Sequence, residues 1–367
     1  MRRLLLLIAP AMLAACASPG VPPGGPVDTE APKVLRIVPD SGRAGTTPKE
    51  VIFRFDEVVS ERPAGVASLE ALFLISPRDG SPRVDWHRDE ISVRPRRNWR
   101  SNTAYTVTLL PGISDLRGNV RNTGTVTLFS TGATIPKSRL KGTLFNWAES
   151  RAINRSGFIE ARRLDDTTLV YVAATDSLGT YVFPNLSPGS YQIRGIGDDN
   201  GNRGLDPRES WDSVSVSLAD SATVDLYAFV HDSVGARLVS ASLRDSVTIE
   251  LSFDSPLSPS TAVGPTNIRV RSADSTDVGI LTVAAPPPDT TATSRRMKRP
   301  APTRTLLVKV SRQLRPGTSY RVTANGVTSL SGIARSTETI LTVPAAPPPS
   351  PVVTPKNVPV VPPPIKR

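Results

Sequence analysis

Cysteine and histidine are almost missing from this 367-residue chain, which contains one Cys and two His. A single cysteine excludes an internal disulfide, and so few thiols and imidazoles exclude a Cys/His zinc cluster or a Cys–His catalytic dyad. A hydrolase triad would need one of the two histidines, and no nucleophile motif accompanies either of them. Aromatic residues are also scarce, at 5% of the chain. The composition therefore predicts a protein that is not an enzyme.

Long hydrophobic runs are missing as well. Beyond the N-terminus no stretch is apolar for about 18 residues, so we expect the rest of the chain to lie outside the membrane. Proline, in contrast, is abundant: the chain has 36, roughly twice the average frequency. Lys and Arg outnumber Asp and Glu by 44 to 33, which gives a net charge of +11. These features indicate a basic, proline-interrupted chain.

The first 16 residues have the pattern of a secretory leader, with two arginines before an apolar segment too short to span a bilayer. The only cysteine, Cys16, follows Leu-Ala-Ala, and this sequence resembles the lipobox of bacterial lipoproteins. The resemblance implies a diacylglyceryl group on the Cys16 thiol, cleavage before Cys16 and acylation, for example with palmitate, of the new N-terminus. Ala17 follows in place of the Asp that resembles an inner-membrane retention signal, which favours the outer membrane. An ordinary signal peptide with an incidental cysteine is the alternative.

Short alternating runs of apolar and polar residues begin after a Pro/Gly-rich tether. Such runs occur at residues 51–56, 90–95, 105–109 and 126–130, with turn residues about every ten positions. Pro and Gly interrupt almost every window that could hold an amphipathic helix. The pattern predicts an all-β chain of sandwich modules.

An internal repeat is visible. The strand that ends in Phe55-Asp56 is matched by the strand that ends in Phe253-Asp254, and the strand around Tyr105 is matched by the one around Tyr320. The first copy, with its Ile-x-Phe-x-Phe-Asp and Asn-Thr-x-Tyr-Thr-Val strands and its Asp-Leu-x-Gly-Asn turn, resembles the bacterial Ig-like repeat of S-layer and other cell-surface proteins. The second copy matches less well, because it lacks the Asp and Asn of the turn and carries an insertion.

The segment between the two copies has a different pattern. Its Asp-Ser-x-Gly-x-Tyr-x-Phe-x-Asn-Leu-x-Pro-Gly-x-Tyr string resembles the transthyretin-like regulatory β-sandwich that is appended to many secreted carboxypeptidases and adhesins. The resemblance implies a non-catalytic module, and the whole layout resembles an Ig-like-domain lipoprotein. The predicted order is a lipoprotein signal peptide and lipobox (1–16), a Pro/Gly tether (17–31), an Ig-like domain (32–133), a transthyretin-like domain (139–230), an Ig-like domain (235–344) with a disordered insertion (284–305), and a Pro-rich tail (345–367).

One loop, residues 198–209, has oxygen-bearing side chains at the spacing of a calcium loop of the EF-hand kind. Such loops hold Ca²⁺ through six to eight oxygens at about 2.3–2.6 Å. The loop departs from the pattern at its sixth position, where Arg203 replaces the glycine of the sharp turn, and it follows a strand. A polar hairpin loop held by Asx-turns is the alternative. By this resemblance the predicted ligands of a structural calcium ion are Asp198, Asn200, Asn202, Gly204, Asp206 and Glu209.

Other polar groups are less specific. Enzymes that cleave glycosides use two carboxyl groups, and the chain has carboxylate pairs at residues 56–57 and 165–166. Both pairs fall at strand ends or turns, where acids are common. His87, in a predicted hairpin turn, and His231, in a predicted linker, are expected to be solvated. Arginines at residues 94–100 surround Trp99, and for an exported protein such a surface suits lipid headgroups or anionic polysaccharide rather than nucleic acid. A plain solvated arginine-rich surface is the alternative.

Together these patterns predict a non-catalytic, lipid-anchored protein of the cell envelope with structural or adhesive modules. An accessory subunit that binds polysaccharide or another envelope protein is the alternative function. The expected partners are the membrane, through the anchor, and envelope polysaccharide or proteins. No cofactor is predicted other than structural calcium.

Overall fold

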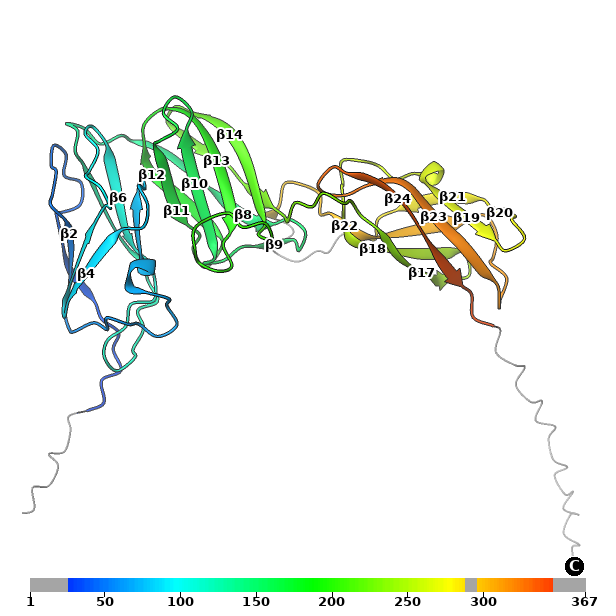
Figure 1. Ribbon diagram of the computed structural model, residues 1–367, viewed down its shortest axis with the longest axis horizontal. Coiled ribbons are helices and arrows are strands. Elements are labelled where there is room, and N and C mark those ends of the chain that lie inside the picture. The colour runs from blue at the N-terminus through cyan, green and yellow to red at the C-terminus, as the bar shows by residue number, and fades with distance from the viewer. Residues whose placement is uncertain (1–25, 288–295, 346–367) are drawn as a thin grey trace, which may run out of the picture.

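The computed structural model describes residues 26–287 and 296–345. The predicted signal peptide with Cys16, most of the tether, the Pro-rich tail and the centre of the insertion lie outside these residues. The regular secondary structure of the described chain is almost all β-strand, arranged as three sandwich modules in a row along the long axis (Figure 1). The prediction of an all-β fold of tandem sandwiches is confirmed. No helix among the described residues is long and apolar enough to cross a membrane.

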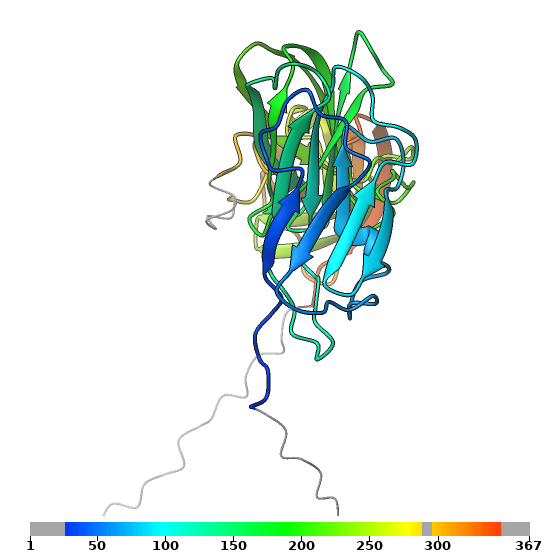
Figure 2. The same cartoon turned by 90° about the vertical axis from the view of Figure 1, so that its left-hand side faces the viewer.

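Module 1 packs a four-stranded sheet, in the order β1-β2-β5-β4, against a three-stranded sheet, in the order β3-β6-β7, and both are antiparallel. Figure 2 looks along the long axis of the molecule with this module in front, and the N-terminal segment enters at its lower end. A short 3-10 helix, η1 (Leu69–Leu72), precedes β3. The strands are β1 (Val34–Val38), β2 (Val51–Phe55), β3 (Phe73–Ser76), β4 (Arg83–His87), β5 (Glu90–Arg94), β6 (Ala104–Leu109) and β7 (Thr125–Ser130).

The core of module 1 follows from the two-residue period of its strands. In β2 the side chains of Val51, Phe53 and Phe55 are buried, whereas Arg54 between them is exposed. The ring of Phe53 meets that of Phe73, from the opposite sheet, edge-on at 5.3 Å between centroids. Apolar side chains from both sheets therefore interdigitate in one core between them.

Module 2 also has two sheets, one in the order β11-β10-β13-β14 and one around β8, which pairs with β12, β15, β16 and β9. The strand β8 lies antiparallel to β12 and parallel to β15 and β16. The strands are β8 (Ser138–Asn146), β9 (Arg151–Ala152), β10 (Gly157–Arg163), β11 (Val170–Ala174), β12 (Thr180–Leu186), β13 (Gly189–Gly197), β14 (Trp211–Leu218), β15 (Ser221–Thr223) and β16 (Leu226–Ala228).

Module 3 pairs its strands in two four-stranded sheets, β17-β18-β22-β21 and β20-β19-β23-β24. A 3-10 turn, η2 (Pro265–Asn267), precedes β19. The strands are β17 (Leu238–Asp245), β18 (Thr248–Leu257), β19 (Ile268–Ser272), β20 (Asp277–Val278), β21 (Ile280–Ala284), β22 (Thr303–Val310), β23 (Ser319–Thr328) and β24 (Ala334–Thr342).

The internal repeat has a structural cause. In module 1 the carboxylate of Asp56 accepts a hydrogen bond from the backbone N–H of Lys33 at 2.7 Å, and in module 3 Asp254 accepts the N–H of Arg237 at 2.8 Å. Each of these aspartates thus ties the end of the second strand to the start of the first strand of its module. The repeated Phe-Asp string therefore marks equivalent positions.

The repeated tyrosines have a common role too. The hydroxyl of Tyr105 accepts the backbone N–H of Arg100 at 2.7 Å, and that of Tyr320 accepts the N–H of Arg315 at 3.0 Å. In both modules the donor lies five residues before the tyrosine, so each ring fills the core while its hydroxyl holds the preceding loop.

The prediction of a disordered insertion at 284–305 is wrong at its described ends, because Ala284 closes β21, residues 303–305 belong to β22, and residues 297–300 contact module 2. The Trp147 indole N–H donates to the carbonyl of Pro300 at 2.9 Å, and the guanidinium of Arg299 lies 4.7 Å from the ring centroid of Tyr227. These contacts give the basic, proline-rich sequence an aromatic surface to bind, which its composition alone does not reveal.

Candidate metal loop at a module junction

Modules 1 and 2 share an apolar contact between β3 and β11. Leu74 of β3, Phe158 of β10 and Val172 of β11 are buried together in a small cluster that belongs to neither module's own core. Next to it, the backbone N–H of Arg78 donates to the carbonyl of Val170 at 2.8 Å. The two sandwiches therefore meet through packed side chains and a backbone bridge, in addition to the chain that links them.

A buried carboxylate lies at the centre of this junction. Glu160 on β10 is only 3% exposed, and one of its oxygens accepts the guanidinium of Arg78, from module 1. Its other oxygen accepts Nε of Arg194 on β13 at 3.0 Å. Because a buried charge is costly unless it is paired, the two arginines make the burial of Glu160 tolerable only when both modules are in place.

The strand β10 is buried on both of its faces. Its side chains at Ile159 and Ala161 point into the core of module 2, and those at Phe158 and Glu160 belong to the junction. None of the junction residues on β10 was predicted from the sequence. The available signal was an acid directly flanked by apolar residues, Ile159 and Ala161, which suggests a paired, buried charge.

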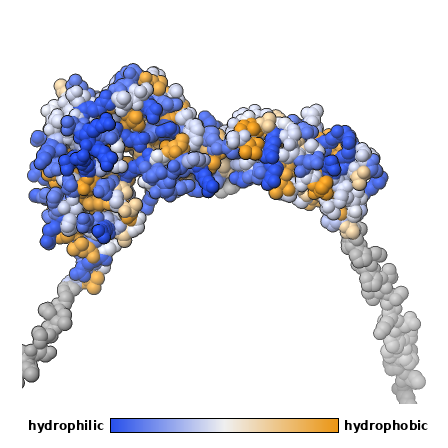
Figure 3. Space-filling view, viewed as in Figure 1, coloured by the Kyte–Doolittle hydropathy of each residue, from blue (hydrophilic) through white to orange (hydrophobic). Residues whose placement is uncertain are grey.

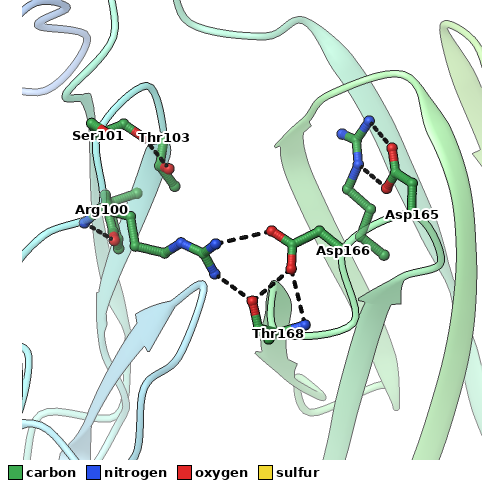
Figure 4. Close-up of polar contacts among 8 residues, drawn as sticks. Arg100, Ser101, Thr103, Asp165, Asp166 and Thr168 are labelled. Carbon is green, nitrogen blue, oxygen red and sulfur yellow. Dashed lines mark hydrogen bonds and ion pairs between the residues drawn. The ribbon is translucent and has the colours of Figure 1, made fainter.

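Figure 4 shows a second polar bridge between the two modules. The guanidinium of Arg100, in module 1, donates to Asp166 at 2.9 Å and to the hydroxyl of Thr168 at 3.1 Å. The neighbouring carboxylate, Asp165, is turned to Arg163 of its own module, and this pairing lowers the pKa of Asp165. The two acids at 165–166 thus serve separate ion pairs and do not face one another across a cleft.

The loop at residues 198–209 lies between β13 and β14, beside this junction. One oxygen of the Asp198 carboxylate accepts the backbone N–H of Arg203 at 3.0 Å, across the loop. The carboxylate of Glu209 accepts the N–H groups of Asp199, at 3.2 Å, and of Asp206, at 3.0 Å. Asp198 and Glu209 are both buried, so the two ends of the loop are held together by acids that point inward.

The middle of the loop is held by its asparagines. The side-chain amides of Asn200 and Asn202 both donate to Asp206, at 2.6 and 2.9 Å. Their oxygens accept the backbone N–H groups two residues further on, those of Asn202 and Gly204. The structure therefore links five of the six predicted ligand residues in one network of Asx-turns, whereas the Asp198 side chain bonds only to the N–H of Arg203.

Arg203, which replaces the expected glycine, has the backbone conformation of a glycine, with φ of +59°. Its guanidinium leaves the loop and enters module 1, where it donates to the carbonyl of Phe73 at 2.8 Å and to that of Ala71. In return, Arg78 of module 1 donates to the carbonyl of Arg203 at 3.1 Å. Burial lowers the pKa of Arg203, and the nearby Asp198 acts in the opposite direction.

A separate acidic group lies in module 1. Asp28, Glu57 and Asp115 each offer a carboxylate oxygen, and these oxygens lie within 4.8 Å of one another, whereas the three loop carboxylates do not make so tight a group. Burial, together with the negative charges of Asp115 and Asp28, raises the pKa of Glu57. Asp115 already accepts two backbone N–H groups and the side-chain amide of Asn119.

The sequence predicts the exposure of three ring-bearing residues, Trp99, His231 and His87. Trp99 does not form a surface patch with the neighbouring arginines. Its ring packs edge-on against Tyr105 and Phe129, beside the core of module 1. His231 is exposed, as expected, and its ring also stacks on Trp211, at 4.1 Å between centroids, and on Phe229, at 4.0 Å. Burial lowers the pKa of its imidazole. His87 is exposed at the end of β4, as expected.

A shallow hollow lies between η1 and β4 on module 1. It is lined by polar side chains and by the half-buried Trp86, whose indole N–H donates to the carbonyl of Val59 at 3.0 Å. Among the lining groups are Arg62, Glu70 and His87. In Figure 3 the visible face of modules 1 and 2 is mostly hydrophilic, which fits a surface exposed to water.

Residues 28–131 match a family described as bacterial Ig-like domain. Module 1 is thus similar to bacterial Ig-like domains. No protein of curated function matches the chain. Solved structures are also similar to parts of it. The N-terminal part of the bacterial S-layer protein SbsC has 19% identity over 29% of this chain and 23% of its own, with a TM-score of 0.22.

Two further similar structures are of proteins from Parabacteroides merdae and Bacteroides ovatus. A DUF3823 family protein from Parabacteroides merdae has 13% identity over 57% of this chain and 99% of its own, with a TM-score of 0.21. The SGBP-B protein of the mixed-linkage glucan utilization locus of Bacteroides ovatus, solved with a heptasaccharide, has 11% identity over 87% of this chain and 72% of its own, with a TM-score of 0.18. These scores are too low to transfer a function from any of these proteins to this chain.

Proposed function

We propose that this chain is a non-catalytic, lipid-anchored protein of the bacterial cell envelope whose β-modules have a structural or adhesive role. The observation that carries the proposal is that acidic side chains of module 2 form ion pairs with arginines of module 1. At the junction, Glu160 and Asp166 are each paired with an arginine of module 1, so these acids join modules and do not face a substrate. Such pairing supports a stiff spacer made of modules 1 and 2.

The leader sequence supports the envelope location and the anchor. Cys16 follows Leu-Ala-Ala at the end of a short apolar segment, and the Pro/Gly-rich stretch after it would separate the folded modules from a membrane. A single acyl chain binds a membrane only marginally, whereas two or three anchor a protein durably. Ala17, in place of an aspartate after Cys16, favours an outer-membrane location for the anchored protein.

Metabolic labelling tests the anchor. Cells that express the full chain are grown with a clickable palmitate analogue, and the protein is compared with a Cys16→Ser variant. We expect label in the wild type and none in the variant, together with a shift of the variant out of the membrane fraction. A Ser18→Ala variant serves as a control that should be labelled like the wild type. Equal labelling of the Cys16→Ser variant would overturn the anchor.

The hollow with Trp86 favours a second function, an accessory subunit that binds envelope polysaccharide. Partly exposed indole faces with polar neighbours suit the stacking and hydrogen bonding of a sugar ring. The full-length protein would be applied to a glycan array beside Trp86→Ala and, as a control for an aromatic ring elsewhere, Trp211→Ala. Retention that only Trp86→Ala abolishes would favour this second function, and no retention would favour the structural role.

A further inference from the structure

The loop at residues 198–209 keeps one feature that its internal hydrogen bonds do not explain. Asp198 is 8% exposed, and its Oδ1 atom is enclosed and has no hydrogen-bond partner among the described residues. Its other oxygen accepts the N–H of Arg203 from across the loop, so the carboxylate points inward. Buried polar atoms are nearly always satisfied, and a charged oxygen left without a partner is especially costly. Oδ1 of Asp198 therefore lacks a hydrogen-bond donor or a cation in direct contact among the described residues.

The chemistry of the loop indicates which group this is. Its donors are carboxylate and amide oxygens, with no sulfur or imidazole nitrogen, and hard cations such as Ca²⁺ prefer this set. Asp206 meanwhile accepts two neutral amides, those of Asn200 and Asn202, on a single oxygen. A cation bound near Asp198 would draw the Asp206 carboxylate toward it and take the place of these weaker donors. An adaptable loop of this kind suits Ca²⁺ better than Mg²⁺, which demands near-ideal octahedral geometry.

Arg203, at the sixth position of the loop in place of glycine, does not prevent cation binding. That position of a calcium loop needs a left-handed backbone, and Arg203 has it, with φ of +59°. The guanidinium of Arg203 is directed out of the loop, where it donates to the carbonyls of Phe73 and Ala71 in module 1 and so occupies no ligand position. The residue that breaks the sequence pattern is therefore the residue that reaches the neighbouring module.

We propose that the 198–209 loop binds a structural calcium ion through Asp198, Asp206 and Glu209, with Asn200, Asn202 and Gly204 completing the site, and that the ion holds Arg203 in its contact with module 1. The ion ties the backbone on both sides of Arg203, so it fixes the direction in which this side chain leaves the loop. Calcium thereby stabilises the junction of modules 1 and 2. This inference is independent of the lipid anchor.

Calorimetric titration of the full-length protein in detergent with CaCl₂, after treatment with EDTA, tests the site. We expect one ion per chain with a Kd between about 10⁻⁴ and 10⁻³ M, the range of extracellular modules. Glu209→Gln, and as a second variant Asp206→Asn, should weaken binding at least about tenfold. Asp199→Asn removes the same charge from an exposed position that supplies no predicted ligand, and it should bind like the wild type.

Two results would overturn the site. The first is the lack of saturable binding at about 10 mM CaCl₂. The second is unchanged affinity in both Glu209→Gln and Asp206→Asn, which would place any bound ion elsewhere, for example at the Asp28, Glu57 and Asp115 carboxylates. Circular dichroism in EDTA shows that each variant is folded before titration.

The Arg203→Gly variant distinguishes calcium binding from the contact with module 1. Glycine can keep the left-handed backbone of the loop, but it lacks the guanidinium that reaches module 1. In the wild type, calcium should slow hydrogen exchange across residues 69–76 of module 1. In Arg203→Gly, calcium affinity should stay within about threefold of the wild type, while this slowing is lost. Retained slowing in Arg203→Gly would overturn the proposed coupling, and so would a wild type whose residues 69–76 do not respond to calcium.

Discussion

Glu160 is an acid between the apolar residues Ile159 and Ala161 of β10, and its two arginine partners come from different modules. Such a group contributes little net stability relative to an apolar residue, but removing one member leaves the others buried without a counter-charge. The residue therefore makes the correct docking of module 1 on module 2 a condition for a favourable fold. Arg203, in the loop between β13 and β14, also contributes to this junction, because its guanidinium donates to two carbonyls of module 1.

Replacing Glu160 should be costly. Glu160→Gln leaves Arg78 and Arg194 partly buried without their anion, and we expect a loss of about 3 kcal/mol in the free energy of unfolding, the low end for a broken buried pair because both arginines are about one-third exposed. Denaturant unfolding measures it. The control is Asp165→Asn, which removes the exposed partner of Arg163 and should change stability by less than about 1 kcal/mol. Equal effects of the two variants would contradict this account.

At the scale of elements, β8 is the strand on which the second sheet of module 2 depends. It pairs with β12 on one side and with β15 on the other. Gly142 allows this arrangement, since a Cβ atom built there would lie 1.7 Å from the carbonyl oxygen of Val224, just after β15. Any side chain at this position must push the backbone between β15 and β16 away from β8.

Gly142→Ala should therefore destabilise module 2 by more than about 2 kcal/mol, as overpacking against backbone does. Thermal unfolding followed by circular dichroism measures the loss. Gly264→Ala is the matched control, because Gly264 has a negative φ and a Cβ atom added there would meet nothing within 4 Å, and its effect should stay within about 1 kcal/mol. A Gly142→Ala variant as stable as Gly264→Ala would show that β15 does not lie where we describe it.

Much of this element structure follows from local patterns. The alternation at residues 51–55 predicts β2 and its buried face, and the repeated Phe-Asp and Tyr strings predict equivalent strands in modules 1 and 3. The six oxygen-bearing positions of the 198–209 loop could also be named, because their spacing is local. The strand β8 was not identified, since its second half is buried on both faces and shows no alternation.

The module junction could not be predicted, for a physical reason. Whether Arg203 is solvated or inserted depends on carbonyls at Ala71 and Phe73, more than 100 residues earlier in the chain. Likewise, composition predicts a disordered insertion because it contains no information about Trp147 and Tyr227, which bind Arg299. Contacts between modules depend on shape and distance, and a periodic pattern contains neither.

At the scale of the whole molecule, the three sandwiches form an elongated body, and the ends of the described chain leave it at opposite ends of its long axis (Figure 1). Modules 1 and 2 are joined by an apolar cluster, a buried ion-pair group and the Arg203 contact, and module 3 adds the aromatic contacts of Arg299. A stiff body of this kind suits a spacer or an adhesive protein that must hold its outer modules away from a surface.

The central claim is that Cys16 holds this body on a membrane, and the intact mass of the protein extracted from cell membranes tests it most directly. The account predicts a polypeptide that begins at Cys16 and carries the added mass of a diacylglyceryl group and an acyl chain. A soluble polypeptide that still contains residues 1–15, with Cys16 unmodified, would contradict it.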